Sequence, residues 1–546
     1  MEIRRFNKSE KGAALVLVII CAFILSIMGF SLLSLAKAEI LLTKKAVNRS
    51  KAFYAAEAGI EYAVAMLNKL LGEQRRALYL DGDGDIVDRY EIPFPTTDGF
   101  TFDVFTIEKV GSVETRVIDS GPYKGLKPVI QKYKITSQAT SDTSDATSAR
   151  LVQWIEEQGF PLFQFAAFYE QDLELEPGPP MTITGRIHSN HDIYLTSNST
   201  LSIDSYLTSS GNIYRSSKPG DPGEESGTVQ IKDAEGDYED MYFDSSDPDW
   251  TNKSLETWGG KVQSQVHGIV TLSLPLPVGA EPIDIINRGD AGDTEALKEA
   301  RLYYQADLRI IDGVAYDKSG NVVDLTYEKD GSSVNPVDMD KSFYNPREGA
   351  DVTITEIDIS KLVESGKFPA NGILYVSTDS AGEQDGVRLV NGPVLPPGGL
   401  TVATDNPLYI QGDYNLNKAP ASVFCDAINV LSNAWQDGVM LLQSATDTEV
   451  NTSFASGHTP TTDAGYGGGL ENFPRFLESW SGKKFTMTGS LSSLWFSEIA
   501  TGEWRYGEPY YNAPERHWGF DEASFSNLPP GTVVLCRTHR SNWQQH

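Results

Sequence analysis

Residues 13–36, AALVLVIICAFILSIMGFSLLSLA, contain no charged side chain. At ~1.5 Å per residue, a helix of this length spans ~36 Å, which is enough to cross the ~30 Å hydrocarbon core of a bilayer with some tilt. A cleaved secretory signal would have a shorter apolar region that ends at a small-residue cleavage site. The stretch therefore predicts a transmembrane helix at residues 13–36.

The basic residues beside this helix indicate its orientation. Arg4, Arg5, Lys8 and Lys11 all precede the apolar run. Because basic residues are retained on the cytoplasmic side of a membrane, the leader is expected in the cytoplasm and the rest of the chain outside. The sequence predicts a single-pass protein of the inner (cytoplasmic) membrane with an extracytoplasmic body.

The net charge of −30 combines two unlike parts of the chain. Residues 1–51 hold nine basic and three acidic side chains, a charge of +6, so the remainder carries −36. A body this acidic is repelled by nucleic-acid phosphates and by anionic lipid headgroups. The composition therefore argues against a nucleic-acid partner.

The helical pattern continues beyond residue 36. There is no proline before Pro93, and apolar residues recur at three- and four-residue steps, as in an amphipathic helix: Phe53, Ala56, Ile60, Ala63, Met66 and Leu67. We expect one helix from Ala13 to Leu78. Its first half suits lipid, and the amphipathic continuation, residues 37–80, suits packing on a folded head.

The amino-terminal residues resemble a known family. A basic leader ending at Lys11-Gly12, the run AALVLVII and the downstream AFYAAEAGIEYA resemble the amino-terminal module of PilX-type minor pilins, in the type IV pilus and type II secretion pseudopilin superfamily. The resemblance covers residues 8–70. It implies that a prepilin peptidase cuts between Gly12 and Ala13, leaving residues 1–12 as a prepilin-type leader, and that the new amino terminus is methylated.

The same resemblance implies the partners of the protein. They are other minor pilins or pseudopilins, the prepilin peptidase, an inner-membrane assembly platform and membrane lipid, with incorporation into a surface filament. Leu17 departs from the pattern of major pilins, which usually carry glutamate at this fifth mature position to neutralise a neighbouring amino terminus in the apolar filament core. The missing acid favours a minor or tip subunit. An uncleaved signal anchor is the alternative.

The segment after the helix predicts a small head. Glycine and aspartate in DGDGDIVDRYEI, residues 81–92, break the helix, and alternating apolar residues around Phe102 then indicate antiparallel strands. SARLVQWIEEQGF, residues 148–160, is expected to form a short helix. Residues 81–172 are therefore expected to form a pilin-like α+β head.

Residues 173–440 predict a β-solenoid-like domain. Short apolar triplets alternate with Gly, Asn, Ser and Asp, and SNHDIY at 189–194 is followed twenty residues later by SSGNIY at 209–214. This is the length of one coil of a parallel β-solenoid. An acidic insertion at 220–250 and a helical segment near 291–305 interrupt the pattern. We expect a right-handed parallel β-helix, with an interrupted sandwich as the alternative.

Residues 441–546 are rich in aromatic side chains. They are expected either to cap the open end of the solenoid or to form a face that binds carbohydrate or protein. The candidate binding aromatics are Trp504, Tyr506, Tyr510, Tyr511 and Trp518. Strings such as GRIHSN and YYNAPERHWGFD also resemble those of large PilX-type proteins, which extends the resemblance over most of the chain without implying a reaction.

Four aspartates in the turn after the helix are a candidate calcium site: Asp81, Asp83, Asp85 and Asp88. An EF-hand loop fits in neither register, because Ile86 or Tyr79 then falls on an essential position. A solvated turn is the alternative. No other cofactor is expected.

Other polar residues give little support for catalysis. His188 and His191 stand three apart in a region that predicts strand and turn, where their side chains would point to opposite faces. No nucleophile elbow, HExxH motif or phosphate-binding glycine loop occurs, so no catalytic residue is expected. Of the three cysteines, Cys21 lies in the apolar run, and Cys425 and Cys536 could form one disulfide.

The sequence thus predicts an α+β, mainly β chain with a long amino-terminal transmembrane and amphipathic helix, a small pilin-like head, a right-handed parallel β-helix and a carboxy-terminal cap. The function expected is that of a minor pilin-like or pseudopilin-like structural component rather than an enzyme. The alternative is a membrane-anchored β-helix that acts as a carbohydrate-binding or carbohydrate-active module.

Overall fold

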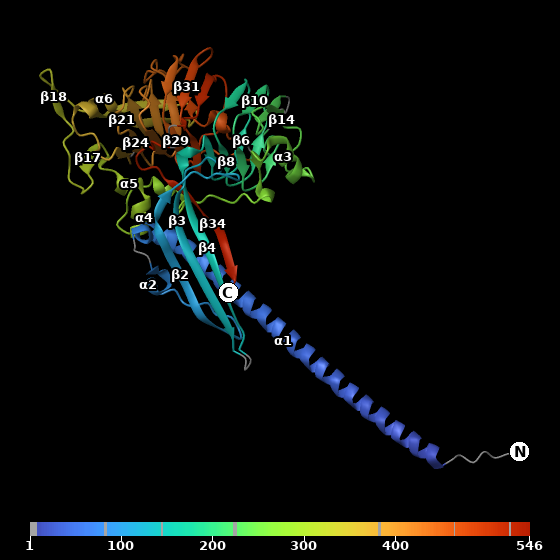
Figure 1. Cartoon of the computed structure of the whole chain (residues 1–546). Helices are drawn as coiled ribbons and strands as arrows, with labels where there is room; N and C mark the ends of the chain where they lie inside the picture. Colours follow the sequence, from blue (N-terminus) through green and yellow to red (C-terminus); the bar gives the residue numbers. More distant parts are fainter. Residues whose placement is uncertain are drawn as a thin grey trace.

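The computed structural model describes residues 8–80, 84–142, 146–221, 227–380, 384–463, 465–522 and 526–545. A long helix, α1, leads into an antiparallel sheet, and beyond this sheet lies a larger body rich in short strands (Figure 1). The expected class, a long apolar amino-terminal helix followed by a large β-rich region, is confirmed.

Helix α1 spans Lys8–Leu80, 73 residues. Its backbone leaves helical geometry at Gln74, where φ is −146° and ψ is 31°. The helix expected from the apolar run and its amphipathic continuation is confirmed as far as Glu73, whereas the expectation of one unbroken helix to Leu78 is wrong because of the kink at Gln74. The two halves differ in burial, because the first half projects freely while the second half packs on the head (Figure 1).

The head is one antiparallel sheet of five strands in the order β1-β2-β3-β4-β34. The strands are β1 (Gly84–Asp85), β2 (Phe100–Thr115), β3 (Val129–Ser141), β4 (Ser148–Pro161) and β34 (Val534–Gln545), with a short helix α2 (Ile86–Arg89) after β1. The second half of α1 covers one face of the sheet. Their shared core includes Ala56, Ile60, Leu67, Phe105, Ile135, Leu151 and Ile155.

The helix expected at residues 148–160 is wrong, because this segment is strand β4. Ala149, Leu151 and Ile155 face α1 with the two-residue period of a strand. The segment pairs with β3 on one side and with β34 on the other. Two hydrogen-bonded neighbours outweigh the helical propensity of its Glu, Gln and Ala residues.

The first series of body strands repeats in threes. It comprises β5 (Ala167–Tyr169), β6 (Leu173–Leu175), β7 (Met181–Ile183), β8 (Ile187–Ser189), β9 (Ile193–Leu195), β10 (Thr200–Ile203), β11 (Leu207–Ser209), β12 (Ile213–Tyr214) and β13 (Thr228–Lys232). Every third strand pairs in parallel, as in Leu173↔Ile193↔Ile213. The equivalent positions of the predicted twenty-residue repeat therefore lie side by side in the structure. Tyr194 and Tyr214, for example, stack with ring centroids 5.1 Å apart.

A connecting segment follows the first series. It contains β14 (Tyr238–Asp240), α3 (Trp250–Trp258), β15 (Val262–Gln263), the 3-10 turns η2 (Gln265–His267) and η3 (Pro282–Ile285), and the helices α4 (Glu295–Ala300) and α5 (Leu302–Gln305). The two helices α4 and α5 confirm the helical segment expected near residues 291–305.

The second series builds the other half of the body. Its strands are β16 (Leu308–Ile311), β17 (Val314–Asp317), β18 (Tyr327–Lys329), β19 (Ser332–Val334), β20 (Val337–Asn345), β21 (Ala350–Asp358), β22 (Ile373–Ser377), β23 (Gln384–Val390), β24 (Leu400–Ala403), β25 (Leu408–Gln411), β26 (Ala421–Cys425), β27 (Ile428–Leu431), β28 (Thr448–Val450), β29 (Ser453–His458), β30 (Arg475–Phe476), β31 (Lys484–Thr488), β32 (Leu491–Phe496) and β33 (Glu515–Gly519), with α6 (Ile359–Glu364) after β21 and η4 (Leu470–Asn472) before β30. Most of them stack in parallel.

The two series meet in one eleven-stranded sheet. Its order is β15-β11-β8-β5-β32-β29-β26-β24-β22-β16-β17, so β32, late in the second series, pairs in parallel with β5, the first strand of the first series, at Leu491↔Ala167. The chain therefore enters the body at β5, in the middle of this sheet. The first series adds strands toward the β15 edge, and the second series adds strands from the β17 edge back toward β5.

The separate cap expected for residues 441–546 is wrong. The strands of this segment continue the parallel sheets of the body, and β32 lies inside the largest sheet rather than beyond its end. The last strand, β34, leaves the body altogether and joins the head beside β4, where Arg540 and Glu61 of α1 pair at 2.6 Å. The strand edges of β5 and β4 find partners in this way, which avoids open edges.

The contact between α1 and the head depends on Gly59. A Cβ at this position would overlap Ser137 Oγ and lie 2.7 Å from Phe102 Cε1, whereas Gly29, in the free half of α1, has open space around it. We expect Gly59→Val to lower the free energy of unfolding of the head by about 1–3 kcal/mol through overpacking. Urea unfolding of the detergent-solubilised protein measures this. Equal losses for Gly59→Val and the matched Gly29→Val would contradict the packing shown by the structure.

Candidate functional site

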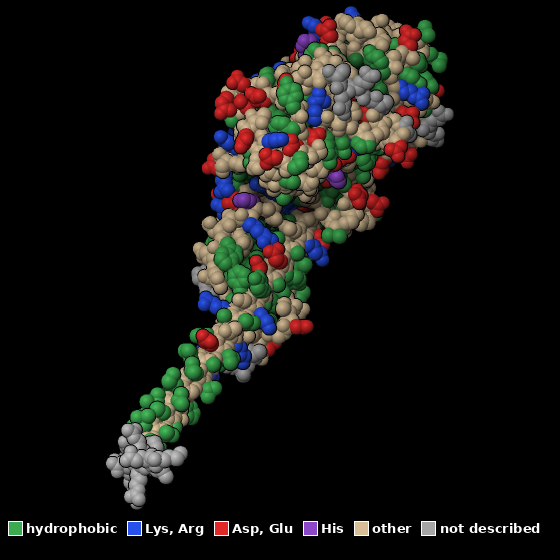
Figure 2. Space-filling model, turned by 90° about the vertical axis from the view of Figure 1, so that its right-hand side faces the viewer, with side chains coloured by type: hydrophobic (Ala, Val, Ile, Leu, Met, Phe, Trp, Pro, Cys, Tyr) green, Lys and Arg blue, Asp and Glu red, His purple; other side chains and the backbone are tan. Residues whose placement is uncertain are grey.

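The free half of α1 is an apolar surface that is not covered by any part of the chain that the structure describes. The large apolar side chains from Leu15 to Val47 are all exposed, with exposed fractions from 47% to 74%. Figure 2 shows hydrophobic side chains along this part of the helix. Among the described residues, α1 is the one helix long and apolar enough to cross a membrane. A patch of this size marks a surface that is covered by membrane or protein.

The residues of the predicted cleavage junction lie in this helix. Gly12 and Ala13 are exposed, and Leu17 is 66% exposed. The fifth position therefore presents a leucine among other exposed apolar side chains.

The aspartate turn is described in part, since Asp81 and Asp83 lie outside the described residues. Asp85 acts as a cap: its Oδ1 accepts hydrogen bonds from the backbone N–H groups of Val87 and Ile107, each at 3.0 Å. Burial raises the pKa of the Asp85 carboxyl. Asp88 lies in the first turn of α2. In the described ranges, no group of three or more His, Cys, Asp or Glu residues is placed to hold a metal. Calcium at this turn stays a prediction.

His188 is a buried, hydrogen-bonded core residue. Its Nδ1 lies 2.9 Å from Thr208 Oγ1, its Nε2 lies 3.2 Å from Asn190 Oδ1, and its ring stacks on Phe168. Burial lowers its pKa to about 3, so the ring is neutral. His191 is exposed. The two histidines therefore do not converge, as the strand pattern indicated.

The cysteines do not form a disulfide. Cys425 is buried in β26 of the body, whereas Cys536 lies in β34 of the head, and all three cysteines are free thiols. Burial raises the pKa of the Cys425 thiol to about 12, so it is protonated and unreactive at neutral pH.

The structure gathers four of the five predicted aromatics into one cluster. Trp504 stacks with Tyr506 and donates its Nε1–H to Tyr511 Oη at 2.9 Å, and Arg505 bonds Tyr510 Oη at 2.7 Å. Tyr511 in turn donates to Asn472 Oδ1 at 2.7 Å. The fifth predicted residue, Trp518, lies apart in β33, packed on the main core of the body.

A cavity of about 520 Å³ opens beside this cluster. We call it the aromatic cavity. Its lining residues are Thr459, Pro460, Thr462, Gly465, Tyr466, Phe496, Ser497, Thr501, Glu503 and Trp504. Sequence reasoning missed Tyr466 and Phe496, because no spacing along the chain links a loop before η4 with the end of β32. Only the stacking of the strands brings them together.

Hydrogen bonds and an ion pair with charged residues hold the lining of the cavity in place. Tyr466 donates to Glu471 Oε1 at 2.5 Å, and Glu471 Oε2 also accepts from the backbone N–H of Glu176 at 3.2 Å. Arg475 pairs with Glu348 at 2.9 Å and donates to Thr459 Oγ1 at 3.1 Å. These bonds fix the orientation of the lining side chains before any ligand arrives.

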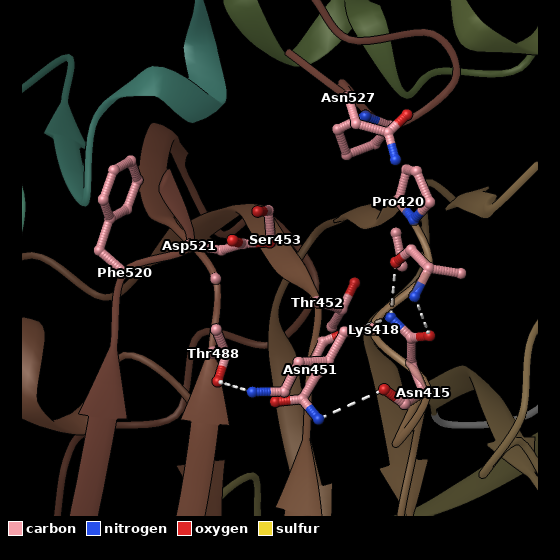
Figure 3. Close-up of a pocket in the computed structure, with 14 residues that line it drawn as sticks. Asn415, Lys418, Pro420, Asn451, Thr452, Ser453, Thr488, Phe520, Asp521 and Asn527 are labelled. Carbon is pink, nitrogen blue, oxygen red and sulfur yellow. Dashed lines mark hydrogen bonds between the residues drawn. The ribbon is translucent and has the colours of Figure 1, made fainter. Parts of the chain in front are cut away.

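A second pocket, drawn in Figure 3, is much smaller. Its volume is about 30 Å³, and its lining includes Asn415, Asn451 and Lys418. The Asn415 side chain donates to the backbone carbonyl of Asn451 at 2.6 Å, and the Asn451 side chain donates to the backbone carbonyl of Asn415 at 3.3 Å. Lys418 donates to Thr488 Oγ1 at 3.3 Å. A space of this size holds about one water molecule. It serves the packing of successive strand turns rather than a ligand.

The buried Glu471 makes stability depend on pH. Burial raises its pKa to about 7, from an ordinary value of 4.5. Between these two values the carboxyl is protonated only in the folded protein, so stability falls as pH rises through this window. We expect Glu471→Gln to remove up to about 3 kcal/mol of this dependence. Urea unfolding at about pH 4 and about pH 8, one value on each side of the window, measures it.

The matched control is Glu328→Gln, which removes an exposed carboxylate and is expected to keep the pH dependence of the wild type. If Glu471→Gln also kept it in full, then other carboxyls whose pKa values burial raises, among them Glu170, Glu174, Glu176 and Glu478, would account for the whole effect.

Comparisons of the chain with protein-family models, with curated proteins and with solved structures find no match. The resemblance to PilX-type minor pilins therefore rests on the residues quoted for it.

Proposed function

We propose that this protein is a minor pilin-like or pseudopilin-like structural subunit of a type IV pilus or type II secretion-type system. The observation that carries the proposal is the division of α1. Before the kink at Gln74, the helix has an exposed first part that is uncharged over residues 13–36, and a later part that packs on an antiparallel sheet. This division suits a subunit whose apolar half is covered by lipid before assembly and by other subunits afterwards.

The role proposed is structural, with the amino terminus in the cytoplasm and the body outside. Cleavage between Gly12 and Ala13 would remove the basic leader and leave the apolar helix as the new terminus. Leu17 at the fifth mature position supports a minor or tip subunit, since it offers no carboxylate to the amino terminus of a neighbour.

The body proposed for display is a β-solenoid. Three observations on strands β5 to β12 support this interpretation over a sandwich: successive short strands belong to different sheets, every third strand pairs in parallel, and the register step is twenty residues. Its right-handed twist is part of the proposal. Calcium at the aspartate turn, at the exit of α1, would be a further part of it.

The way the body is attached suits a displayed module. The body lies between β4 and β34, adjacent strands that pair over most of their length, so both of its ends are anchored in the head. A pulling force on the body therefore loads a long row of backbone hydrogen bonds and the core that joins the sheet to α1. Such an attachment resists removal better than a single linker.

Coexpression with a prepilin peptidase tests the proposal. We expect intact-mass analysis to show loss of residues 1–12 and methylation of Ala13 in the wild type and in Gly29→Ala, a matched change in the same helix. Gly12→Ala should keep the leader, because the peptidase requires the small, flexible residue at the cut. An unchanged amino terminus in the wild type, or equal processing of Gly12→Ala, would contradict the pilin-like function and favour a plain signal anchor.

A further inference from the structure

The aromatic cavity has the size and the wall chemistry of a ligand site. Its volume of about 520 Å³ lies within the ~300–1,000 Å³ of small-molecule sites. Three rings line it: Tyr466, Phe496 and Trp504. Phe496 is 43% exposed, although it stands at the end of a buried strand. A large apolar ring held open to solvent beside a cavity indicates a surface used for contact.

The rings are held in place before a ligand binds. Trp504 meets Tyr466 edge to face, with centroids 5.2 Å apart, and its only polar atom is occupied by Tyr511. The Tyr466 hydroxyl is likewise occupied by Glu471. With their polar atoms engaged, the two rings offer the cavity apolar surface. Such preorganisation lowers the entropic cost of binding.

The polar part of the wall consists mainly of oxygen atoms. Thr501 and Glu503 contribute to it. Ser497 and Thr459 also line the cavity, but their hydroxyls already bond Arg475 and backbone carbonyls. Glu503 is paired with Arg505 at 3.4 Å, so charge at the rim is balanced. The Thr501 hydroxyl can donate hydrogen bonds to ligand hydroxyls and accept them, and the Glu503 carboxylate can accept them. The −36 charge of the residues after position 51 repels anions.

Apolar ring faces beside hydroxyl and carboxylate oxygens match a sugar ring, whose C–H face is apolar and whose edge carries hydroxyls. We propose that the aromatic cavity binds a neutral sugar residue of a glycan. Trp504 and Phe496 pack against the sugar face, and Glu503 and Thr501 accept from its hydroxyls. A uronic acid or a sulfated sugar is excluded by charge.

The cavity lies where the two series of strands join. Phe496 ends β32, the strand that pairs with β5, and Tyr466 leads into η4, which lies against β6. This part of the body is far from the free end of α1 (Figure 1). Glycan binding there goes beyond the proposed structural role, since it leaves the helix free for membrane or filament while the body contacts a surface.

Calorimetric titration of the full chain, in a detergent without a sugar headgroup, tests the proposal. The probes are neutral oligosaccharides of glucose, N-acetylglucosamine, mannose and galactose, with oligogalacturonate as the acidic counterpart. We expect saturable binding of at least one neutral oligosaccharide and none of oligogalacturonate. Trp504→Ala and Phe496→Ala should each weaken binding about tenfold, as expected for central aromatic contacts.

Two further variants separate ligand contact from folding. Glu503→Gln, at an exposed rim residue, should weaken binding without changing the melting temperature, and Tyr242→Ala, which removes an 84% exposed ring elsewhere, should leave binding unchanged. The proposal is overturned if no neutral oligosaccharide binds, if oligogalacturonate binds more tightly, or if Trp504→Ala and Phe496→Ala bind like the wild type. Peptidase processing is measured separately. Failure of glycan binding therefore does not contradict the pilin-like function, and failure of processing does not contradict glycan binding.

Discussion

The parallel pairing of β32 with β5 is the constraint on which the rest of the body depends. Backbone hydrogen bonds of 2.8 Å, from Leu491 to Ala166 and from Glu170 to Ser493, join the end of the second strand series to the start of the first. Without them both strands would present open edges, and the largest sheet would divide into two. The aromatic cavity and the carboxyl beneath it lie at this junction, so the pairing also builds the candidate ligand site.

The same closure principle operates at the head. Strand β34 returns to pair with β4, so the chain enters and leaves the body through adjacent strands of one sheet. The helix packed on that sheet is therefore coupled to both ends of the body. The proposed assembly function of the free helix and the proposed binding function of the body can coexist, because the head lies between their surfaces.

The distribution of charge differs between the free helix and the body. The uncharged run of α1 is suited to lipid or to a filament core, and the acidic body is suited to water. Inside the body, however, carboxyls such as Glu471 are buried and held by hydrogen bonds from Tyr466 and a backbone N–H. Burial of a carboxylate is costly unless the group is protonated or hydrogen-bonded. These carboxyls are therefore expected to make the stability of the junction between β32 and β5 depend on pH.

The sequence by itself determined α1, the break that follows it and the twenty-residue repeat. These features depend on local patterns, namely a charge-free run of membrane length, helical spacing of apolar residues, and recurrence of SNHDIY as SSGNIY. Four of the five candidate aromatics lie in one cluster, as expected for residues close together in the chain, and their role in binding stays a prediction. Only the tertiary structure decided that residues 148–161 form a strand, that the last strand joins the head, and that Tyr466 and Phe496 complete the cavity. Each of these depends on pairing between segments far apart in the chain, as in Leu491↔Ala167. The local sequence pattern does not indicate which distant segments pair.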